Sequence, residues 1–468
     1  MRAYVAAAVL LPLLACQARA RVSRALPPLE SEGEVYLYLQ PFPVEAEKLS
    51  FSIQSIAAVR PDGTAVPLEL FLSDLSPEAA PRQRLLAHGR LPPDTYDALA
   101  IQVSRATLVT ADGKADLHVS KEPDQVPVAL HVVQRRATVL TLSLRLDHAV
   151  SPSYGFHPAF DATTPPAPVV ELAGYVTSPG SAALAVFDKR RREVVAVLPA
   201  GREPQGVALD PQQRRSYVAL AGDDQVQILN LAAGEETGRI SLRPGDRPRE
   251  LALTPDAHTL VSTNPGSRTA SFLDPGSMLE RDRVPVGEAP EALLLDRTGQ
   301  RAYVFNRRSA SVTVLDVANR QVVGTIATDP EPLRGQLNRA GTRLYVAHAG
   351  SAYLNVYALP DLALSTRFYV GLGTSAIKVD PRTDLLYVGR RDEGRLDVYD
   401  PSAFIPVDHV DLPGAPTYLV IDDAESTLLA VIPEARQVAV VDLTRRRVVG
   451  RIDVLRDPDE LALFGERH

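Results

Sequence analysis

The chain of 468 residues has a single cysteine, Cys16, and no tryptophan. One cysteine excludes intramolecular disulfides, zinc sites built from several thiolates and the Cys-x-x-Cys-His attachment of haem. Aromatic residues make up only 6% of the chain, and its 50 lysines and arginines are outnumbered by 57 aspartates and glutamates. A chain with a net charge of -7 and few aromatic rings lacks the basic surface and the stacking platforms typical of nucleic-acid binding.

Motifs that carry known chemistry are also missing. The sequence has no Gly-x-Ser-x-Gly elbow, no phosphate-binding loop and no His-Glu-x-x-His, and its nine histidines are scattered. We therefore predict no catalytic residue, no metal site and no cofactor. Whether the protein is an enzyme stays open at this stage, with the sequence favouring a protein that is not one.

The N-terminus carries one apolar run, over residues 3–15, preceded by Arg2. A run of this length suits the core of a signal peptide and is too short to cross a bilayer as a helix. It ends in Leu-Leu-Ala-Cys, which resembles a bacterial lipobox, and this resemblance implies that Cys16 is lipidated. The alternative is cleavage after residues 18–20, Ala-Arg-Ala, which would remove the cysteine and release a soluble periplasmic protein.

The lipobox resemblance also implies a location. Gln17 follows the cysteine where inner-membrane lipoproteins of many Gram-negative bacteria carry aspartate, so we expect transport to the outer membrane. Several acyl chains hold a protein on a membrane stably, whereas one chain binds only marginally. The expected partner of the N-terminus is therefore the membrane itself, in the cell envelope.

Seven copies of one pattern fill the chain from Gly174 to its C-terminus, each opening on a strand that reads Tyr-Val or a close variant. Successive copies are 42 or 43 residues apart. A fixed period of about 40 to 45 residues is typical of the blades of a β-propeller. The copies begin at Tyr175, Tyr217, Leu260, Tyr303, Tyr345, Tyr387 and Leu429.

A second strand of the repeat follows a Gly/Pro turn and also occurs seven times, the last time over Pro458–Leu463. The chain enters the array at the Tyr-Val strand and leaves it at this strand, so the last strand has no blade of its own. We predict that it joins the first blade and closes the ring, because an open ring would expose unpaired strand edges.

The repeats resemble the bacterial YVTN-type propeller repeats, named for the strand that reads Tyr-Val-Thr-Ser at 175–178 and Tyr-Val-Phe-Asn at 303–306. The strand that ends in aspartate, as at Asp316, matches as well. This family includes lactonase-like proteins, accessory proteins of periplasmic quinoprotein oxidation, surface antigens and many binding proteins. The resemblance thus implies the fold and leaves the function open.

The segment before the propeller alternates apolar and polar residues in several short runs, which predicts strands. Residues 76–88 are the one segment that favours a short helix. The turn Leu-Pro-Pro-Asp-Thr-Tyr, ending at Tyr96, resembles that of a prealbumin-like β-sandwich domain of bacterial lipoproteins, in which the tyrosine lies under the sandwich. We expect a signal peptide over 1–15, a tether over 16–32, a β-sandwich over 33–150, a Pro-rich linker over 151–173 and the propeller over 174–468.

Loops on one face of the propeller provide a candidate binding site. Three neighbouring repeats place a polar residue three positions after the Tyr, and further arginines follow them. Such a cluster would hold a carboxylate or phosphate, because guanidinium groups donate paired hydrogen bonds to these anions, and its histidine would titrate near neutral pH. The alternative is a set of ordinary loop residues neutralised by nearby acids such as Glu331. The candidate residues are Asn306, Arg307, His348, Arg390 and Arg391.

These observations favour a lipid-anchored binding or scaffolding protein of the cell envelope, with the propeller as the surface that recognises an unknown protein or a small anion. The alternative is a periplasmic lactonase-like or quinoprotein-associated protein that acts on a small anionic or sugar-derived substrate. A pair of acid and base groups converging in the propeller channel would favour the alternative.

Overall fold

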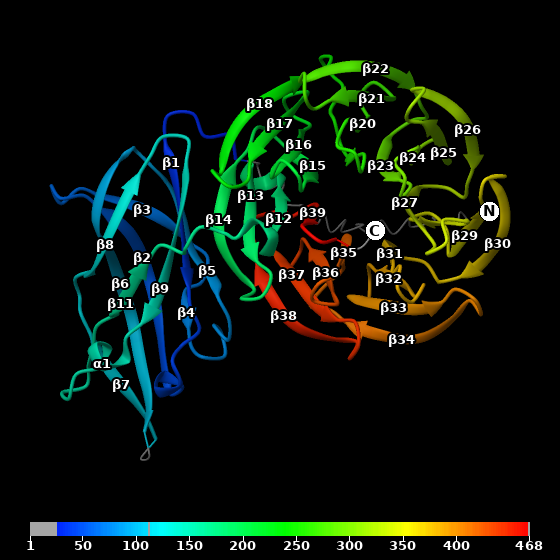
Figure 1. The fold of residues 1–468 in the computed structure, drawn as a ribbon. Helices are drawn as coiled ribbons and strands as arrows, with labels where there is room; N and C mark the ends of the chain where they lie inside the picture. Colours follow the sequence, from blue (N-terminus) through cyan, green and yellow to red (C-terminus); the bar gives the residue numbers. More distant parts are fainter. Residues whose placement is uncertain (1–25, 111–112, 467–468) are drawn as a thin grey trace, which may run out of the picture.

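The computed structural model describes residues 26–110 and 113–466, which form two all-β domains lying side by side (Figure 1). The second domain is a ring of seven four-stranded sheets. The prediction of an all-β chain with a seven-bladed propeller is therefore confirmed. Cys16 and the expected signal peptide lie outside the described residues. Within the described residues, no helix combines the length and the apolar character needed to cross a bilayer.

The N-terminal domain is one eleven-stranded sheet that winds around a single apolar core, a half-barrel consistent with the expected sandwich. Its longer strands alternate as their sequence predicts; in β2, Phe51 and Ile53 are buried while the residues between and beside them are more exposed. Short helical turns are η1 (Val44–Ala46) and α1 (Leu146–Ala149). The strands are β1 (Gly33–Leu39), β2 (Leu49–Val59), β3 (Ala65–Leu70), β4 (Asp74–Leu75), β5 (Arg84–Leu91), β6 (Asp94–Thr110), β7 (Gly113–Val119), β8 (Asp124–Val132), β9 (Ala137–Leu144), β10 (Gly155–Phe156) and β11 (Phe160–Thr163).

The turn before β6 places Tyr96 in the core, as its sequence predicts. The ring is fully buried, and the hydroxyl donates a hydrogen bond of 3.1 Å to the carbonyl of Pro92. The guanidinium of Arg60 lies 5.6 Å from the centre of the same ring. The tyrosine thus ties the Pro-rich turn to the core of the domain.

The prediction of a helix over residues 76–88 is wrong. Only one turn forms there, in which the Ala80 N–H donates to the Ser76 carbonyl, and Arg84–Leu91 is strand β5. This strand pairs along its length with β1 and buries Leu86 and His88. Pairing with β1 and burial in the core outweigh a local preference for helix.

The linker expected over 151–173 is shorter than predicted. Strand β10 pairs with β7 and strand β11 with β9, so residues 155–163 belong to the N-terminal sheet. Phe156 and Phe160 are buried there, with ring centres 4.8 and 6.3 Å from that of Phe51. The prolines limit regular structure in this segment, whereas the two buried phenylalanines attach it to the core of the N-terminal domain.

Each propeller blade has its inner strand at the central channel and its outer strand at the rim (Figure 1). The short turns η2 (Val170–Leu172) and η3 (Pro179–Ser181) flank the first strand of the ring. From inner to outer strand, the blades are β39 (Leu461–Leu463), β12 (Ala173–Ser178), β13 (Ala183–Asp188) and β14 (Glu193–Pro199); β15 (Pro204–Asp210), β16 (Arg215–Leu220), β17 (Gln225–Asn230) and β18 (Glu235–Ser241); β19 (Leu251–Leu253), β20 (Leu260–Asn264), β21 (Thr269–Asp274) and β22 (Leu279–Pro285); β23 (Pro290–Leu295), β24 (Arg301–Asn306), β25 (Ser311–Asp316) and β26 (Gln321–Ala327); β27 (Pro332–Leu337), β28 (Arg343–His348), β29 (Tyr353–Ala358) and β30 (Ala363–Tyr369); β31 (Thr374–Val379), β32 (Leu386–Arg390), β33 (Arg395–Asp400) and β34 (Ile405–Asp411); and β35 (Tyr418–Asp422), β36 (Thr427–Ile432), β37 (Gln437–Asp442) and β38 (Arg447–Asp453).

The acidic residue that ends the third strand of most repeats caps the turn to the outer strand. In the first blade, a carboxylate oxygen of Asp188 accepts the N–H groups of Arg190 and Arg191, both at 2.8 Å, and Arg192 adopts a left-handed conformation (φ 61°). A side-chain oxygen that accepts main-chain N–H groups two and three residues on stabilises such a turn. The same capping occurs at Asn230, Asp274 and Asp442.

In the first blade, the strand nearest the channel comes from the C-terminal end of the chain. Strand β39 pairs antiparallel with β12, with Leu461 opposite Val176 and Leu463 opposite Gly174. Both leucines are buried. The first blade therefore contains strands from both ends of the repeat array.

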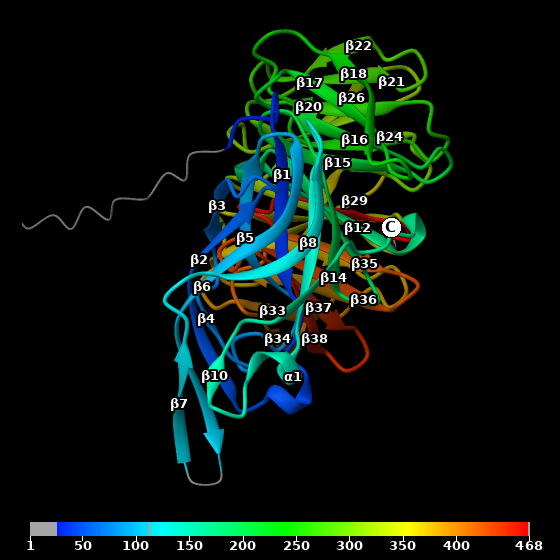
Figure 2. The ribbon, with the colours of Figure 1, turned by 90° about the vertical axis from the view of Figure 1, so that its left-hand side faces the viewer.

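The two domains share one apolar core. Tyr36, Tyr38 and Val139 of the sandwich belong to the same buried cluster as Val194 in β14 and Ile452 in β38. Figure 2 views the molecule from the side of the sandwich, whose strands lie in front of these outer strands of the first and seventh blades.

Polar groups complete this interface. The side chain of Gln83 forms two hydrogen bonds with the main chain of Val194. Its oxygen accepts the N–H at 2.7 Å, and its nitrogen donates to the carbonyl at 3.2 Å. Arg82 and Arg84 both donate to the carboxylate of Asp453, which is 12% exposed. Because a continuous core and buried hydrogen bonds resist separation, the sandwich is fixed to the ring rather than flexibly tethered to it.

Candidate functional site in the central channel

Three ionisable side chains and a tyrosine, from four blades, meet in the central channel, and we call Glu250, Arg334, Tyr418 and Glu460 the channel hub. Each lies two residues after the proline position of its inner-strand repeat. The guanidinium of Arg334 pairs with Glu250, lies 4.5 Å from the ring centre of Tyr418 and has Nη2 3.5 Å from Oε1 of Glu460. Arg334 thus connects the fifth blade to the third, the seventh and the first.

The hub is continued by further contacts. Glu250 also accepts the N–H of Leu293 in the fourth blade, at 2.9 Å. Beside it, Arg249 donates two hydrogen bonds to Asp459, at 2.6 and 3.1 Å. Ion pairs and hydrogen bonds therefore connect residues of the first, third, fourth and fifth blades across the channel.

The two glutamates of the hub share one arginine. Burial raises the pKa of Glu460 well above its usual range, and the negative charge of Glu250 adds to this. Burial raises the pKa of Glu250 too, although Arg334 opposes it. Oε1 of Glu460 is buried and has no hydrogen-bond partner. Both shifts favour the protonated carboxyl group, and the shift is opposed at Glu250 by its direct pairing with Arg334.

Within residues 26–110 and 113–466, no three His, Cys, Asp or Glu side chains converge as metal ligands would. Sequence reasoning missed the residues of the channel hub, although the signal was present: this repeat position is glycine or alanine in the second, fourth and sixth blades and charged or tyrosine in the others.

The residues predicted to form an anion site do not converge. Asn306 is buried and its side-chain amide donates to Thr313 at 2.9 Å, within the fourth blade. Arg390 lies 3.6 Å from Asp397 of its own blade and donates at 2.6 Å to the carbonyl of Val370, which follows the outer strand of the fifth blade. These side chains therefore bond within their own blade or to the adjoining one.

His348 is likewise part of a blade interior. It is 1% exposed, and Nδ1 lies 3.4 Å from the carbonyl oxygen of Tyr353. Burial lowers the pKa of His348 to about 4. The expectation that this histidine titrates near neutral pH is wrong, because a buried imidazole is costly to charge.

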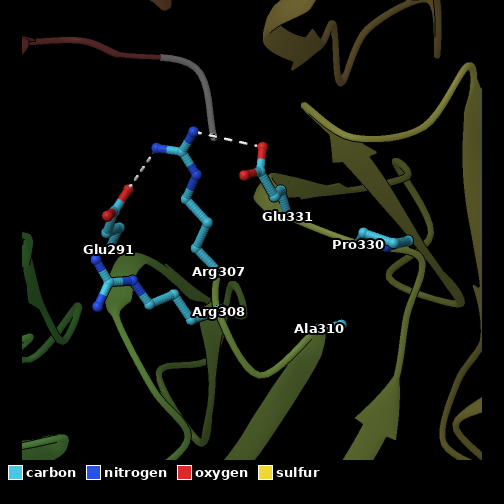
Figure 3. Close-up of a pocket in the computed structure, with 6 residues that line it drawn as sticks. All are labelled: Glu291, Arg307, Arg308, Ala310, Pro330 and Glu331. Atoms are coloured by element: carbon cyan, nitrogen blue, oxygen red, sulfur yellow. Dashed lines mark hydrogen bonds and ion pairs between the residues drawn. The ribbon is translucent and has the colours of Figure 1, made fainter.

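Arg307 lines a shallow pocket of about 460 Å³ between the fourth and fifth blades (Figure 3). Its guanidinium lies 3.2 Å from Glu291 and 3.6 Å from Glu331, so the neutralising acid expected from the sequence is present. Arg308 lines the same pocket and makes no ion pair within the described part of the chain. Arg391 is exposed in the corresponding loop of the sixth blade and does not line this pocket.

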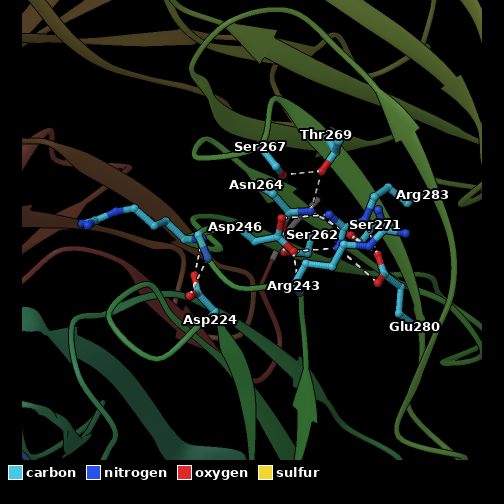
Figure 4. Close-up of polar contacts among 12 residues, drawn as sticks. Asp224, Arg243, Asp246, Ser262, Asn264, Ser267, Thr269, Ser271, Glu280 and Arg283 are labelled. Carbon is cyan, nitrogen blue, oxygen red and sulfur yellow. Dashed lines mark hydrogen bonds and ion pairs between the residues drawn. The ribbon is translucent and has the colours of Figure 1, made fainter.

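Polar side chains of the third blade and of the loop before it form a network of hydrogen bonds and ion pairs (Figure 4). The side chain of Asn264, at the position equivalent to Asn306, donates to Ser271 at 2.7 Å. Arg283 on the outer strand pairs with Asp246 of the incoming loop and with Glu280, at 2.6 and 2.7 Å. The network fastens the loop from the preceding blade to the rim of the third blade.

No family model and no curated protein matches the chain. A functionally unknown protein from Desulfotomaculum acetoxidans superposes with a TM-score of 0.54 at 13% identity, over 62% of this chain and 98% of that chain. The dihydro-heme d1 dehydrogenase NirN superposes with a TM-score of 0.50 at 15% identity, over 62% of this chain and 66% of that one. Kuenenia stuttgartiensis hydrazine synthase gives 0.48 at 17% identity, over 54% and 86%. At identities this low, the two structures with TM-scores of 0.54 and 0.50 show a shared fold alone.

Proposed function

We propose that the protein is a non-enzymatic binding or scaffolding protein whose propeller is the recognition surface. The supporting observation is the shared core between the domains, in which Tyr36 and Tyr38 pack against the outer strands of the first and seventh blades. The sandwich lies at the edge of the ring (Figure 1), where it also contacts loops of the first and seventh blades, with the Phe71 ring 5.5 and 5.6 Å from the guanidinium groups of Arg456 and Arg436. A ring mounted in this way presents its loops in a fixed orientation.

We further propose that this unit is a lipoprotein of the YVTN-repeat type, anchored through Cys16 at the outer membrane. The sequence up to Cys16 supports this part of the proposal. Fractionation of cells tests it: Cys16→Ser should move the protein from the membrane fraction to the soluble or precursor pool. Unchanged processing of the variant, with no palmitate label on the wild type, would favour cleavage after residues 18–20.

The same proposal includes ring closure. We propose that the pairing of β39 with β12 keeps the first blade shared and the ring closed in solution. Closure matters for recognition because loops of neighbouring blades keep their spacing only while the ring is intact.

Site-specific photo-crosslinking in cells tests the recognition surface. A crosslinking amino acid is placed at Arg308, on the loop face, and in a control at Arg320, an exposed residue of a turn on the opposite face. We expect a discrete crosslinked partner from position 308 and none from 320. Equal labelling from both positions, or none from either, contradicts a loop face that recognises a partner.

A second candidate function is catalysis in the channel, favoured by one observation. Glu250 and Glu460 are two carboxyl groups of different proton affinity beside one arginine, and such pairs occur at acid–base sites. The test is hydrolysis of a panel of lactones by the wild type and by Glu460→Gln. Turnover that Glu460→Gln abolishes would establish catalysis, and absence of turnover in the wild type would leave the hub as a structural element.

A further inference from the structure

A long groove lies where the sandwich meets the first two blades. It has a volume of about 1240 Å³ and follows strand β18 from its preceding turn to Arg239. The opposite wall consists of residues 27–30 and the turn at 134–137 of the sandwich. An ion pair between Arg136 and Glu235 joins the two walls, so the groove continues the interface between the domains.

The floor and the charges of the groove define what fits it. Buried leucines of both blades, such as Leu198 and Leu229, form the apolar floor. The charged residues of the rim pair with one another, as Arg202 does with Asp223 and Arg239 with Glu236. Because its charges are paired, the groove does not select an ion. Its volume exceeds that of most small-molecule pockets, so it has room for a larger ligand.

One buried polar group in this groove lacks a partner. Gln227 is 2% exposed; its amide nitrogen donates to Glu236 at 2.6 Å, whereas Oε1 has no hydrogen-bond partner. At the equivalent position of the fifth blade, the oxygen of Asn355 accepts from Arg367 on the outer strand. In the second blade the outer-strand arginine, Arg239, is bound to Glu236 and Gln225 instead. The oxygen of Gln227 thus lacks the donor that its counterpart has.

The wall of the groove already holds one segment, residues 26–30, through bonds to its main chain. The Glu30 carbonyl accepts from Gln134 at 2.8 Å and from Arg135 at 3.2 Å, and Arg90 donates to the carbonyl of Pro27. The N–H of Leu26 donates to the Gly180 carbonyl at 3.1 Å. Side chains and main-chain groups beside the groove thus already bind the main chain of a non-helical segment.

We propose that this groove binds an extended peptide segment of a partner protein, alongside strand β18. A peptide supplies the N–H donor that Gln227 lacks, is uncharged along its main chain, and can align with the edge of β18, the outermost strand of its blade. This proposal rests on the proposed recognition function and names the place and the chemistry of one partner.

Selection of random peptides displayed on phage, against the whole purified protein, tests the proposal. Ala233→Trp fills the groove at an exposed alanine of its lining, and Gln227→Leu removes the unpartnered oxygen. Ala310→Trp, in the pocket between the fourth and fifth blades, is the matched control. Circular dichroism first checks that each variant is folded.

We expect enriched peptides to bind the wild type and Ala310→Trp equally, and to lose at least tenfold in affinity for Ala233→Trp. For Gln227→Leu the expected loss is roughly five- to tenfold, the effect of one hydrogen bond. No enrichment, or peptides that bind Ala233→Trp as well as the wild type, overturns the proposal. A partner crosslinked from Arg308 in cells would then still support recognition by the loop face, so the two proposals can fail separately.

Discussion

The blades that carry the sandwich and the blades that face solvent are stabilised in different ways. At the third position of the third strand, the first and seventh blades have Ala185 and Ala439, whereas the third and fifth have Ser271 and Asn355, all four buried. On the outer strand, Val194 of the first blade is buried by the sandwich, while Leu364 of the fifth is 51% exposed.

The difference shows how one repeat serves two surroundings. Where a second domain covers the rim, small and apolar residues pack against it and hold the blade by burial. Where the rim meets water, serine, asparagine and outer-strand arginines hold the blade by hydrogen bonds and ion pairs. Variants that remove one kind of support should therefore act on one set of blades.

The largest expected effect comes from deleting residues 457–468. The deletion removes β39 and its buried Leu461 and Leu463, together with two acids of the channel. Each buried leucine stabilises the fold by about 2 to 5 kcal/mol, so the loss approaches the whole stability of a typical domain. Thermal unfolding and size-exclusion chromatography measure it, and Leu279→Ala on an exposed strand is the control. A truncated protein that melts like the wild type and stays monomeric would refute closure by this strand.

A second test compares the polar blades with each other. Arg283→Met leaves Asp246, 1% exposed, without its partner in the third blade and should cost about 3 kcal/mol. Arg367→Met removes the equivalent pair in the fifth blade, where the arginine is 43% exposed, and should cost about 1 kcal/mol. Urea denaturation gives both values. Equal losses would show that burial of the pair does not set its contribution.

A third test separates the sandwich from the ring. Asp453→Ala removes the carboxylate that accepts from Arg82 and Arg84 and should lower the free energy of unfolding by about 2 kcal/mol. The control is Glu425→Gln, whose ion pair with Arg190 is exposed and should contribute less than about 0.5 kcal/mol. If both variants have the wild-type stability, the polar rim of the interface does not hold the domains together.

The smallest expected effect concerns pH. The pKa of Glu460 is higher in the folded protein than in the unfolded chain, so the stabilisation it brings is complete at acidic pH, below the unfolded value. This stabilisation is lost as pH rises through the folded value. The wild type should therefore lose stability as pH rises above the ordinary range of a glutamate carboxyl group, and Glu460→Gln should lose less. Parallel curves for the two proteins would place the proton elsewhere.

The sequence predicted the ring well because its signals are local and repeated. A period of 42 or 43 residues, a Tyr-Val strand and an acidic turn cap act within one blade, and neighbouring blades repeat them. The helix over 76–88 was predicted wrongly because capping residues outlined a helix, while the pairing of β5 with β1 depends on residues far away in the chain.

The candidate site was harder to predict than the fold. Loop positions after the Tyr-Val strand identified Asn306, His348 and Arg390 as neighbours around the ring, but they did not show that these side chains bond to their own blade or to the adjoining one. The channel hub could have been predicted by comparing one position of the seven inner-strand repeats. Arg334 and Glu460 stand there where other repeats have a small residue.

The amino-acid sequence by itself determined the strands and turns of the propeller and the number of its blades, because these depend on contacts between residues close in the chain. Only the tertiary structure decided which charges are buried together and where the domains join. Arg334 meets Glu250, Tyr418 and Glu460, and Gln83 meets Val194, across distances in sequence that no local pattern records. The physical reason is that burial and pairing of polar groups depend on what the folded chain places around them, and not on their neighbours in sequence.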